Sequence, residues 1–309
     1  MEDKFNEDGV MSSLGVGKYI NPLSDWGFKK LFGSEPNKEL LLELLNVILD
    51  ETDKKIVAIE YSNNEHQGLS DSDRSSKFDV SCKTEDGDRF VVEMQNGNQA
   101  HFAKRLIYYS GFPIQEQAKK GMWDFNYAPV IMVGLLNFKI EHLLDEPERC
   151  IYYYDIRERY ISEIMSDRLR FIIVEIDKFN KKININSPIK EKWLYLLKHL
   201  HRLFDKPKAL QEKVFESFFQ AAEVSKLSRE DQQKYINAMR TESDIHNQKE
   251  FRYQEGLKQG REEGREEGME EGIARTRLEL AREFLINGVD IMLISKSTGL
   301  PIEEIENLR

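Results

Sequence analysis

Apolar and polar residues alternate one by one in two neighbouring segments, KFDVSCK (77–83) and RFVVEMQ (89–95). This pattern predicts two β-strands that each bury one face. A three-residue loop, Glu85 to Gly87, joins them into a hairpin when Gly87 takes the left-handed conformation. That loop opposes apolar residues throughout, pairing Phe78 with Met94, Val80 with Val92 and Cys82 with Phe90. A two-residue Asp86-Gly87 turn opposes apolar to polar residues, so the pattern favours the longer loop.

Other apolar runs extend this hairpin into a larger sheet. The strand-like runs are KIVAIEY (55–61), PVIMVGLL (129–136), CIYYYDI (150–156) and RFIIVEI (170–176). Leucines at helical spacing behind Pro36 predict one helix, and a second is expected from about Gln99 to Lys120. After Phe179 the chain is helical and charged. The expected fold class is therefore α/β, a mixed sheet flanked by helices and followed by a helical C-terminal region.

Composition divides the chain into five expected parts. Residues 1–17 are polar and are expected to form a mobile leader. Residues 18–180 carry the α/β domain, and 181–250 form a helical extension. Residues 251–275 are a charged repeat, and 276–309 form a small module resembling a helix-turn-helix.

Three short helices are expected in that last module. Gly288 ends the first helix, Asp290 caps the second, and Gly299 lies in the turn before the third. The third helix is acidic, with Arg309 as its only basic residue, so its phosphate contacts would be poor. We therefore favour a protein-interaction or dimer module over a DNA reader.

Glycine recurs at every fourth residue of the charged repeat, from Gly256 to Gly272. Each glycine costs roughly 1 kcal/mol in a helix relative to alanine, which argues against an isolated helix. A flexible charged linker is one interpretation. The other is that the glycines let two helices approach closely, and because four residues exceed one turn, the helices would wrap around each other. On the second interpretation we expect a homo-oligomer that forms through the C-terminal region.

Charge and cysteine content narrow the class of protein. The net charge of −10 argues against a globally basic nucleic-acid-binding surface, but it allows a local basic cleft. Seven basic residues are available near the candidate site: Lys29, Lys30, Lys77, Lys104, Arg105, Lys119 and Lys120. Cys82 and Cys150 lack a disulfide pattern, which suits a reducing compartment. With no signal peptide or membrane-length apolar span, we expect a cytoplasmic protein without membrane contact.

The hairpin register also predicts a chemical site. It opposes Asp79 to Glu93, with β-carbons roughly 5 Å apart, and Lys77 to Gln95. Opposed carboxylates must be solvated, share a proton or bind a cation. Two interpretations are open: a polar face that simply meets water, or a site for a divalent metal. Mg²⁺, with Mn²⁺ as an alternative, suits a pair of carboxylates because it keeps several waters.

Six segments resemble the PD-(D/E)XK superfamily, and more narrowly the Rpn-like recombination-promoting nucleases and PD-(D/E)XK family transposases. They are NPLSDWGFKKLFG, FDV...VVEMQ, RLIYYS, PVIMVGLLNF, VEIDKF and the glycine repeat. The resemblance implies that Asp79 and Glu93 hold the metal and that Gln95 takes the third catalytic position, where the superfamily has lysine. Gln95 can orient a water but carries no charge. We therefore expect Lys77 to supply an ammonium group.

The implied function is a metal-dependent DNA endonuclease associated with recombination or mobile elements. Lys104, Arg105 and Tyr108, on the helix after the hairpin, are the expected substrate contacts. Asp25, which matches an N-terminal D-x-x-F-K pattern of the family, is either an accessory site residue or a helix cap. The alternative function is a catalytically weak or inactive interaction or regulatory protein that keeps the nuclease fold. Gln95 and the acidic charge keep this alternative open.

Overall fold

The structure is a computed structural model that describes residues 17–50, 52–63, 65–66, 76–97, 101–140 and 146–308. Apart from Gly17, the predicted leader lies outside the described residues. The chain divides into two compact units, residues 1–242 and 243–309. Within the described part of the chain, no helix is long and apolar enough to cross a membrane.

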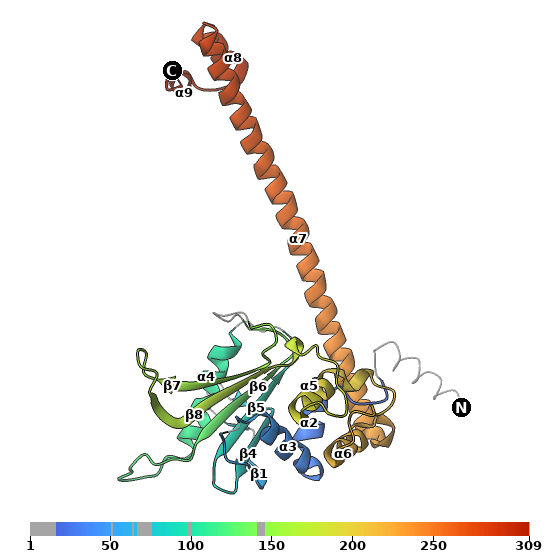
Figure 1. Cartoon of the computed structure of the whole chain (residues 1–309). Helices are drawn as coiled ribbons and strands as arrows, with labels where there is room; N and C mark the ends of the chain where they lie inside the picture. The colour runs from blue at the N-terminus through green and yellow to red at the C-terminus, as the bar shows by residue number, and fades with distance from the viewer. Residues whose placement is uncertain are drawn as a thin grey trace, which may run out of the picture. The chain divides into compact units, whose positions relative to one another are not determined.

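The first unit is built around a six-stranded mixed sheet with the strand order β1-β4-β5-β6-β8-β7 (Figure 1). The strands are β1 (Ile59–Tyr61), β4 (Val80–Thr84), β5 (Arg89–Gln95), β6 (Val130–Leu136), β7 (Ile151–Arg157) and β8 (Ile164–Glu175). Strands β5, β6 and β8 are parallel, and the other neighbours are antiparallel. A second, two-stranded sheet pairs β2 (Glu65–His66) with β3 (Ser76–Lys77). The predicted α/β class with a mixed sheet is confirmed.

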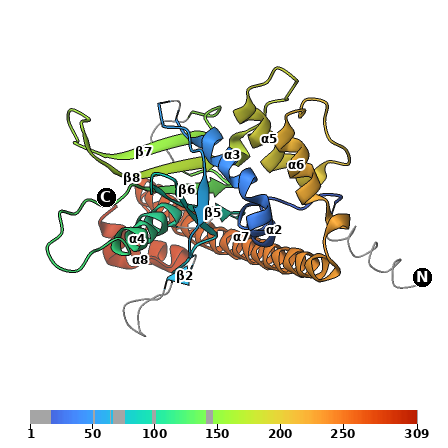
Figure 2. The same ribbon diagram turned by 90° about the horizontal axis from the view of Figure 1, so that it is seen from below.

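Helices cover both faces of this sheet. Among the described residues of the first unit, the α-helices are α2 (Asp25–Phe32), α3 (Lys38–Ile48), α4 (Phe102–Gln115), α5 (Ile189–His199), α6 (Lys213–Ala222) and the start of α7 (Arg229–Ile286). Short 3₁₀ turns are η1 (Glu35–Asn37), η2 (Ile176–Lys178), η3 (Leu200–Arg202) and η4 (Val224–Lys226). Figure 2 shows α4 on one side of the sheet, with α3, α5 and α6 on the other. Alternate residues of the central strands therefore enter two separate cores.

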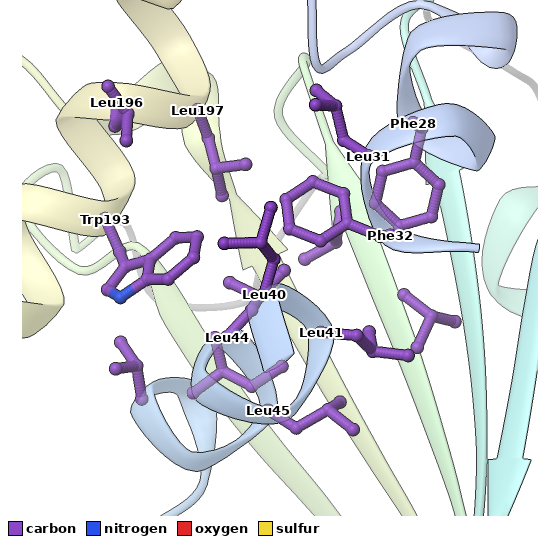
Figure 3. Close-up of a cluster of buried hydrophobic side chains, with 14 of the residues drawn as sticks. Phe28, Leu31, Phe32, Leu40, Leu41, Leu44, Leu45, Trp193, Leu196 and Leu197 are labelled. Atoms are coloured by element: carbon purple, nitrogen blue, oxygen red, sulfur yellow. The ribbon is translucent and has the colours of Figure 1, made fainter. Parts of the chain in front are cut away.

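The larger core is centred on leucines and aromatic rings from α2, α3 and α5 (Figure 3). Leu41 and Leu45 of α3 are fully buried between the sheet and the other helices. The Trp193 ring of α5 lies 6.4 Å from Phe32 of α2 and 5.4 Å from Phe218 of α6. The helices that follow Phe179 thus share one hydrophobic core with the sheet, and they support α2 from the side away from the strands.

The predicted hairpin register is confirmed where the two strands pair. Val80 lies opposite Val92, and Cys82 lies opposite Phe90. The loop is three residues long, because the N–H of Thr84 donates to the carbonyl of Asp88 at 2.9 Å. Gly87 has φ of 90°, the left-handed conformation that this loop requires.

The register ends earlier than predicted, at Val80. In a continued ladder the N–H of Met94 would donate to the carbonyl of Phe78. It donates instead to the Asp79 carboxylate at 2.9 Å, so a side chain takes the place of the strand. Phe78 consequently turns to the opposite face, where its ring lies 5.5 Å from Tyr109. The predicted pairing of Phe78 with Met94 is wrong for this reason.

The second unit contains the rest of α7, followed by α8 (Ile291–Thr298) and α9 (Ile302–Glu306). The glycine repeat is helical throughout, so the expectation that helix is disfavoured there is wrong. Good helix formers, mainly Glu and Arg, separate the glycines. Two of these side chains, Gln259 and Glu263, also pair across a single turn. The helix therefore runs through the repeat although each glycine costs roughly 1 kcal/mol relative to alanine.

The predicted end signals of the terminal module are confirmed. Gly288 has φ of 75° after α7, and Gly299 has φ of 73° after α8. The Asp290 carboxylate caps α8 by accepting the N–H of Met292 at 3.0 Å. The first of the three expected short helices is the last part of α7. A small core centred on the buried side chains of Ala281, Ile294 and Ile305 holds these elements together.

We expect Leu41→Ala to lower the free energy of unfolding by about 2 to 5 kcal/mol, because it leaves a cavity in the larger core. Val57→Ala is the control, since the Val57 side chain is 73% exposed. Its effect should stay within about 0.5 kcal/mol. Urea unfolding of both variants measures the difference, and equal effects would contradict this description of the core.

Candidate active site

Asp79 and Glu93 approach each other at the end of the hairpin farthest from its loop. Asp79 directly precedes β4, and its Oδ2 accepts the N–H of Met94, the residue after Glu93. Glu93 lies on β5 and is only 4% exposed. Its Oε1 atom is buried and has no hydrogen-bond partner among the residues that the structure describes. A buried carboxylate oxygen with free lone pairs is poised to accept a ligand or a proton.

Burial makes ionisation of this pair costly. Burial and the charge of Asp79 raise the pKa of Glu93, Arg105 and Lys29 lower it, and the net result is a pKa of about 8. Burial also raises the pKa of Asp79, against the opposing effects of the Met94 N–H and the Lys29 ammonium. A cation bound at the two carboxylates would remove this cost.

Helix α2 brings an ammonium group to Asp79. Ser24 caps this helix, because its Oγ accepts the N–H of Gly27 at 3.1 Å. Asp25 is therefore the first helical residue, and the alternative that Asp25 is the cap is wrong. The Nζ of Lys29 lies 2.6 Å from Oδ1 of Asp25, and 3.2 Å from Oδ1 of Asp79. Asp25 thus belongs to the site through Lys29.

These contacts keep Lys29 charged. Burial lowers the pKa of its ammonium, but the hydrogen bond to Asp25 and the charge of Asp79 outweigh this and raise the pKa above its usual value. Gly27 makes the tight start of α2 possible, since a Cβ there would meet the carbonyl of Asn21 at 2.1 Å. The ammonium group next to Asp79 therefore comes from α2, and the tight turn between Asn21 and Gly27 determines where this helix begins.

Helix α4 approaches the same carboxylates from the other face of the sheet. Gly134 of β6 lies opposite Glu93, and a Cβ there would meet the Phe102 ring at 2.9 Å. The missing side chain lets α4 pack closely. Arg105 then lies over the rings of Phe102 and Tyr109, at 5.4 and 5.8 Å, and its charge lowers the pKa of Glu93.

The other predicted site residues lie at the end of β5, in the small sheet and on α4. Gln95 is half-buried at the end of β5, and its carbonyl accepts the N–H of Asn137 at 3.0 Å. Lys77 pairs with Glu65 in the small sheet, so its predicted pairing with Gln95 is wrong, and its side chain lies outside the described residues. Lys104 and Tyr108 are exposed on α4. The catalytic and substrate-binding roles of these residues stay predictions.

Sequence reasoning missed two members of this arrangement. Lys29 was one of seven available basic residues, although Asp25 and Lys29, four residues apart, predict an ion pair on one helix face. Glu242 of α7 was not considered. Its carboxylate accepts the N–H of Asp25 at 3.2 Å and the side-chain amide of Asn96 at 3.3 Å. No sequence signal indicates this contact, because the partners are 217 residues apart.

The donor set fits a hard cation that keeps part of its water shell. The described residues hold no group of three or more His, Cys, Asp or Glu arranged to bind a metal. Two carboxylates, one with a buried free oxygen, are what Mg²⁺ commonly takes from a protein. Asp79 and Glu93 would be its protein ligands.

The fold and this site define a class of protein. A mixed sheet flanked by helices, with acidic residues on a central hairpin, is consistent with the PD-(D/E)XK-like α/β fold. The family model described as PD-(D/E)XK nuclease family transposase matches residues 22–251, and the chain belongs to this family. No curated protein and no solved structure is significantly similar to the chain.

The buried Glu93 carboxyl predicts a pH-dependent stability. Its pKa is about 8 in the folded protein and near the ordinary value of 4.5 in the unfolded chain. Between these values the folded state alone keeps the proton, so the free energy of unfolding falls as pH rises through this window. Without metal, we expect Glu93→Gln to be more stable than the wild type by about 1 to 3 kcal/mol at pH 8.5.

Urea unfolding in a chelator at pH 5, 7 and 8.5 measures this difference, which should shrink toward pH 5. Glu60→Gln is the matched control, because Glu60 is exposed on β1. A stability gain that is the same at all three pH values would contradict the burial of an ionisable Glu93.

Proposed function

We propose that this protein is a metal-dependent DNA endonuclease that hydrolyses phosphodiester bonds and is associated with recombination or mobile elements. The observation that carries the proposal is the buried pair Asp79 and Glu93 with the Lys29 ammonium at 3.2 Å from Asp79. The family match supports it, because residues 22–251 include every member of this site.

The chemistry follows from the groups that surround the carboxylates. A Mg²⁺ or Mn²⁺ ion held by Asp79 and Glu93 would supply the charge that favours ionisation of a water and stabilises the developing phosphate charge. Lys29 offers a further positive charge for a phosphate oxygen. Gln95, half-buried at the strand end, orients the attacking water through its amide. Lys77 keeps its proposed role as a second ammonium on the small sheet.

Helix α4 is the proposed contact surface for DNA. Arg105 lies beside the carboxylates, and its planar guanidinium suits a phosphate group. Lys104 is exposed one residue earlier, and Tyr108, 55% exposed, offers a ring on which a base can stack. Lys119 and Lys120 are exposed just beyond the helix. These side chains form a local basic region on a chain whose net charge is −10.

A non-catalytic interaction protein is the second candidate. Gln95 favours it, because the position that carries lysine in the wider superfamily has no charge here. Lys29 weakens this argument, since an ammonium from α2 reaches Asp79. Cleavage by the purified protein decides between the two candidates.

We expect plasmid DNA to be cleaved in Mg²⁺ or Mn²⁺ and the rate to fall at least about 100-fold in Asp79→Ala and Glu93→Gln. Lys29→Met should keep metal binding and lose a similar factor in rate, because one stabilising charge is absent. Lys54→Met is the control, since Lys54 is exposed and pairs with Asp86 on the hairpin loop. Gel assays with calorimetric metal titration measure both quantities.

Wild type and variants that are equally inert would overturn the nuclease proposal and favour the interaction protein. Full activity of Lys29→Met would remove Lys29 from the mechanism. In that case Lys77→Met is the informative variant, and its loss of cleavage with metal binding retained would assign the ammonium to the small sheet.

We further propose that the chain forms homo-oligomers through its C-terminal region. A Cβ at any of the five repeat glycines, Gly256 to Gly272, would meet no atom within 4 Å in the described structure, so this side of the helix is open. Apolar side chains nearby are exposed, among them Leu257, Met269 and Ile273. A partner helix can cover both features.

Light scattering of the full-length protein at micromolar concentration should therefore give a multiple of the 36.3 kDa chain mass. Gly264→Leu with Gly268→Leu should shift the mass toward the monomer, because leucines block close helix approach. Glu263→Leu with Glu267→Leu is the matched control and should not. A monomeric wild type would contradict this proposal.

A further inference from the structure

We propose that Glu242 is a positioning residue of the active site, one that holds α2 so that Lys29 reaches Asp79. The inference rests on the proposed nuclease function for its catalytic consequence. It goes beyond that function by assigning a role to the first turns of α7, which contribute no group to the carboxylate pair.

Helix α2 forms ion pairs with two neighbours, the hairpin and α7. Lys29 points to Asp79, with its Nζ 3.2 Å from the carboxylate, whereas the next residue, Lys30, pairs with Asp231 of α7 at 2.7 Å. Successive helical residues project about 100° apart. Both ion pairs therefore form only when α2 keeps one rotation and one depth relative to α7 and the hairpin.

The α7 side of this contact is a single helix face. Asp231, Tyr235 and Glu242 are separated by four and seven residues, which places them along one stripe. Tyr235 is 1% exposed, its hydroxyl accepts the N–H of Asn21 at 2.8 Å, and its ring lies 5.4 Å from Trp26. The stripe thus contacts Asn21, just before α2, and both Trp26 and Lys30 within α2.

Glu242 completes the stripe at the first residue of α2. Its Oε1 accepts the N–H of Asp25 at 3.2 Å, a group that has no partner within its own helix. The carboxylate also lies at the positive end of the helix dipole, where a negative charge is stabilising. Because the Asp25 side chain binds Lys29 at 2.6 Å, holding the backbone of Asp25 places the Lys29 ammonium.

The other oxygen of Glu242 reaches the ends of two central strands. Its Oε2 accepts the side-chain amide of Asn96, which follows β5 directly, at 3.3 Å. The Oδ1 of Asn96 in turn accepts the amide of Asn137, which follows β6, at 2.9 Å. One carboxylate therefore joins α2 to the strand that carries Glu93 and Gln95.

Burial makes ionisation of the Glu242 carboxyl costly. Burial raises the pKa of Glu242, and the nearby charge of Asp25 raises it further, although the hydrogen bonds from Asp25 and Asn96 lower it. The Glu242 carboxylate is thus the fourth in this region, after Asp25, Asp79 and Glu93, and it is held there at an electrostatic cost. That cost is explained when the geometry it maintains serves the reaction.

The test compares Glu242→Leu, which removes both hydrogen bonds, with Glu242→Gln, which keeps an acceptor for Asp25. Glu255→Gln, on an exposed position of the same helix, is the matched control. All are made in the full-length protein. The first measurement is the acylation rate of Lys29 by an N-hydroxysuccinimide ester, read by mass spectrometry with Lys54 as the internal reference.

We expect Lys29 to react several-fold faster in Glu242→Leu than in the wild type, because the ammonium is no longer held between two carboxylates. In cleavage assays kcat should fall about 10- to 100-fold, as for other residues that orient a site, while KM for DNA changes little. Glu242→Gln should stay close to the wild type in both the Lys29 acylation rate and kcat. Glu255→Gln should equal the wild type in both. A merely structural role would lower the amount of active enzyme without this reactivity change.

An unchanged Lys29 acylation rate in Glu242→Leu would overturn the inference, whatever the activity. A raised rate with unchanged kcat would also overturn it, because α2 would then be held without effect on the reaction. A wild type that neither cleaves DNA nor binds Mn²⁺ in calorimetry would instead overturn the proposed function. The acylation measurement would still decide whether Glu242 holds Lys29 in place.

Discussion

Two carboxylates buried side by side are the constraint on which the rest of this structure depends. Asp79 and Glu93 leave water at the end of one hairpin, and burial raises the pKa of both. Each neighbouring element supplies something that offsets this cost: the strand an N–H, α2 the Lys29 ammonium, and α4 the Arg105 guanidinium. Gly134 lets α4 pack closely on the sheet, and Gly27 lets the chain turn tightly into α2. Both helices can therefore bring their charged side chains near the carboxylates.

The local part of this arrangement could be predicted from the sequence. Alternating residues and a loop ending in Gly87 determine the pairing of Val80 with Val92, because any other register opposes apolar to polar side chains. The prediction failed at Phe78, where the Asp79 carboxylate competes with the backbone for the Met94 N–H. Helix propensity alone also gave the wrong prediction for the glycine repeat, which is helical throughout.

The remaining site residues depend on contacts between distant segments, which periodicity does not reveal. Lys29 reaches Asp79 only because α2 packs on a core completed by α5 and α6. The ammonium group next to Asp79 therefore comes from a helix, whereas Gln95 at the end of β5 carries no charge. The family match extends over both α2 and Glu242, so it includes the whole contact between α2 and α7.

The separation of these partners along the chain determines the order in which the site forms. Asp79 and its Met94 partner are 15 residues apart, whereas Asp25 and Glu242 are 217 residues apart. Contacts between near neighbours form early, and distant ones wait for the intervening chain. During synthesis the carboxylate pair can therefore form long before α7 has been made. The ion pair between Lys29 and Asp79 therefore reaches its final geometry only after residue 242 has been added.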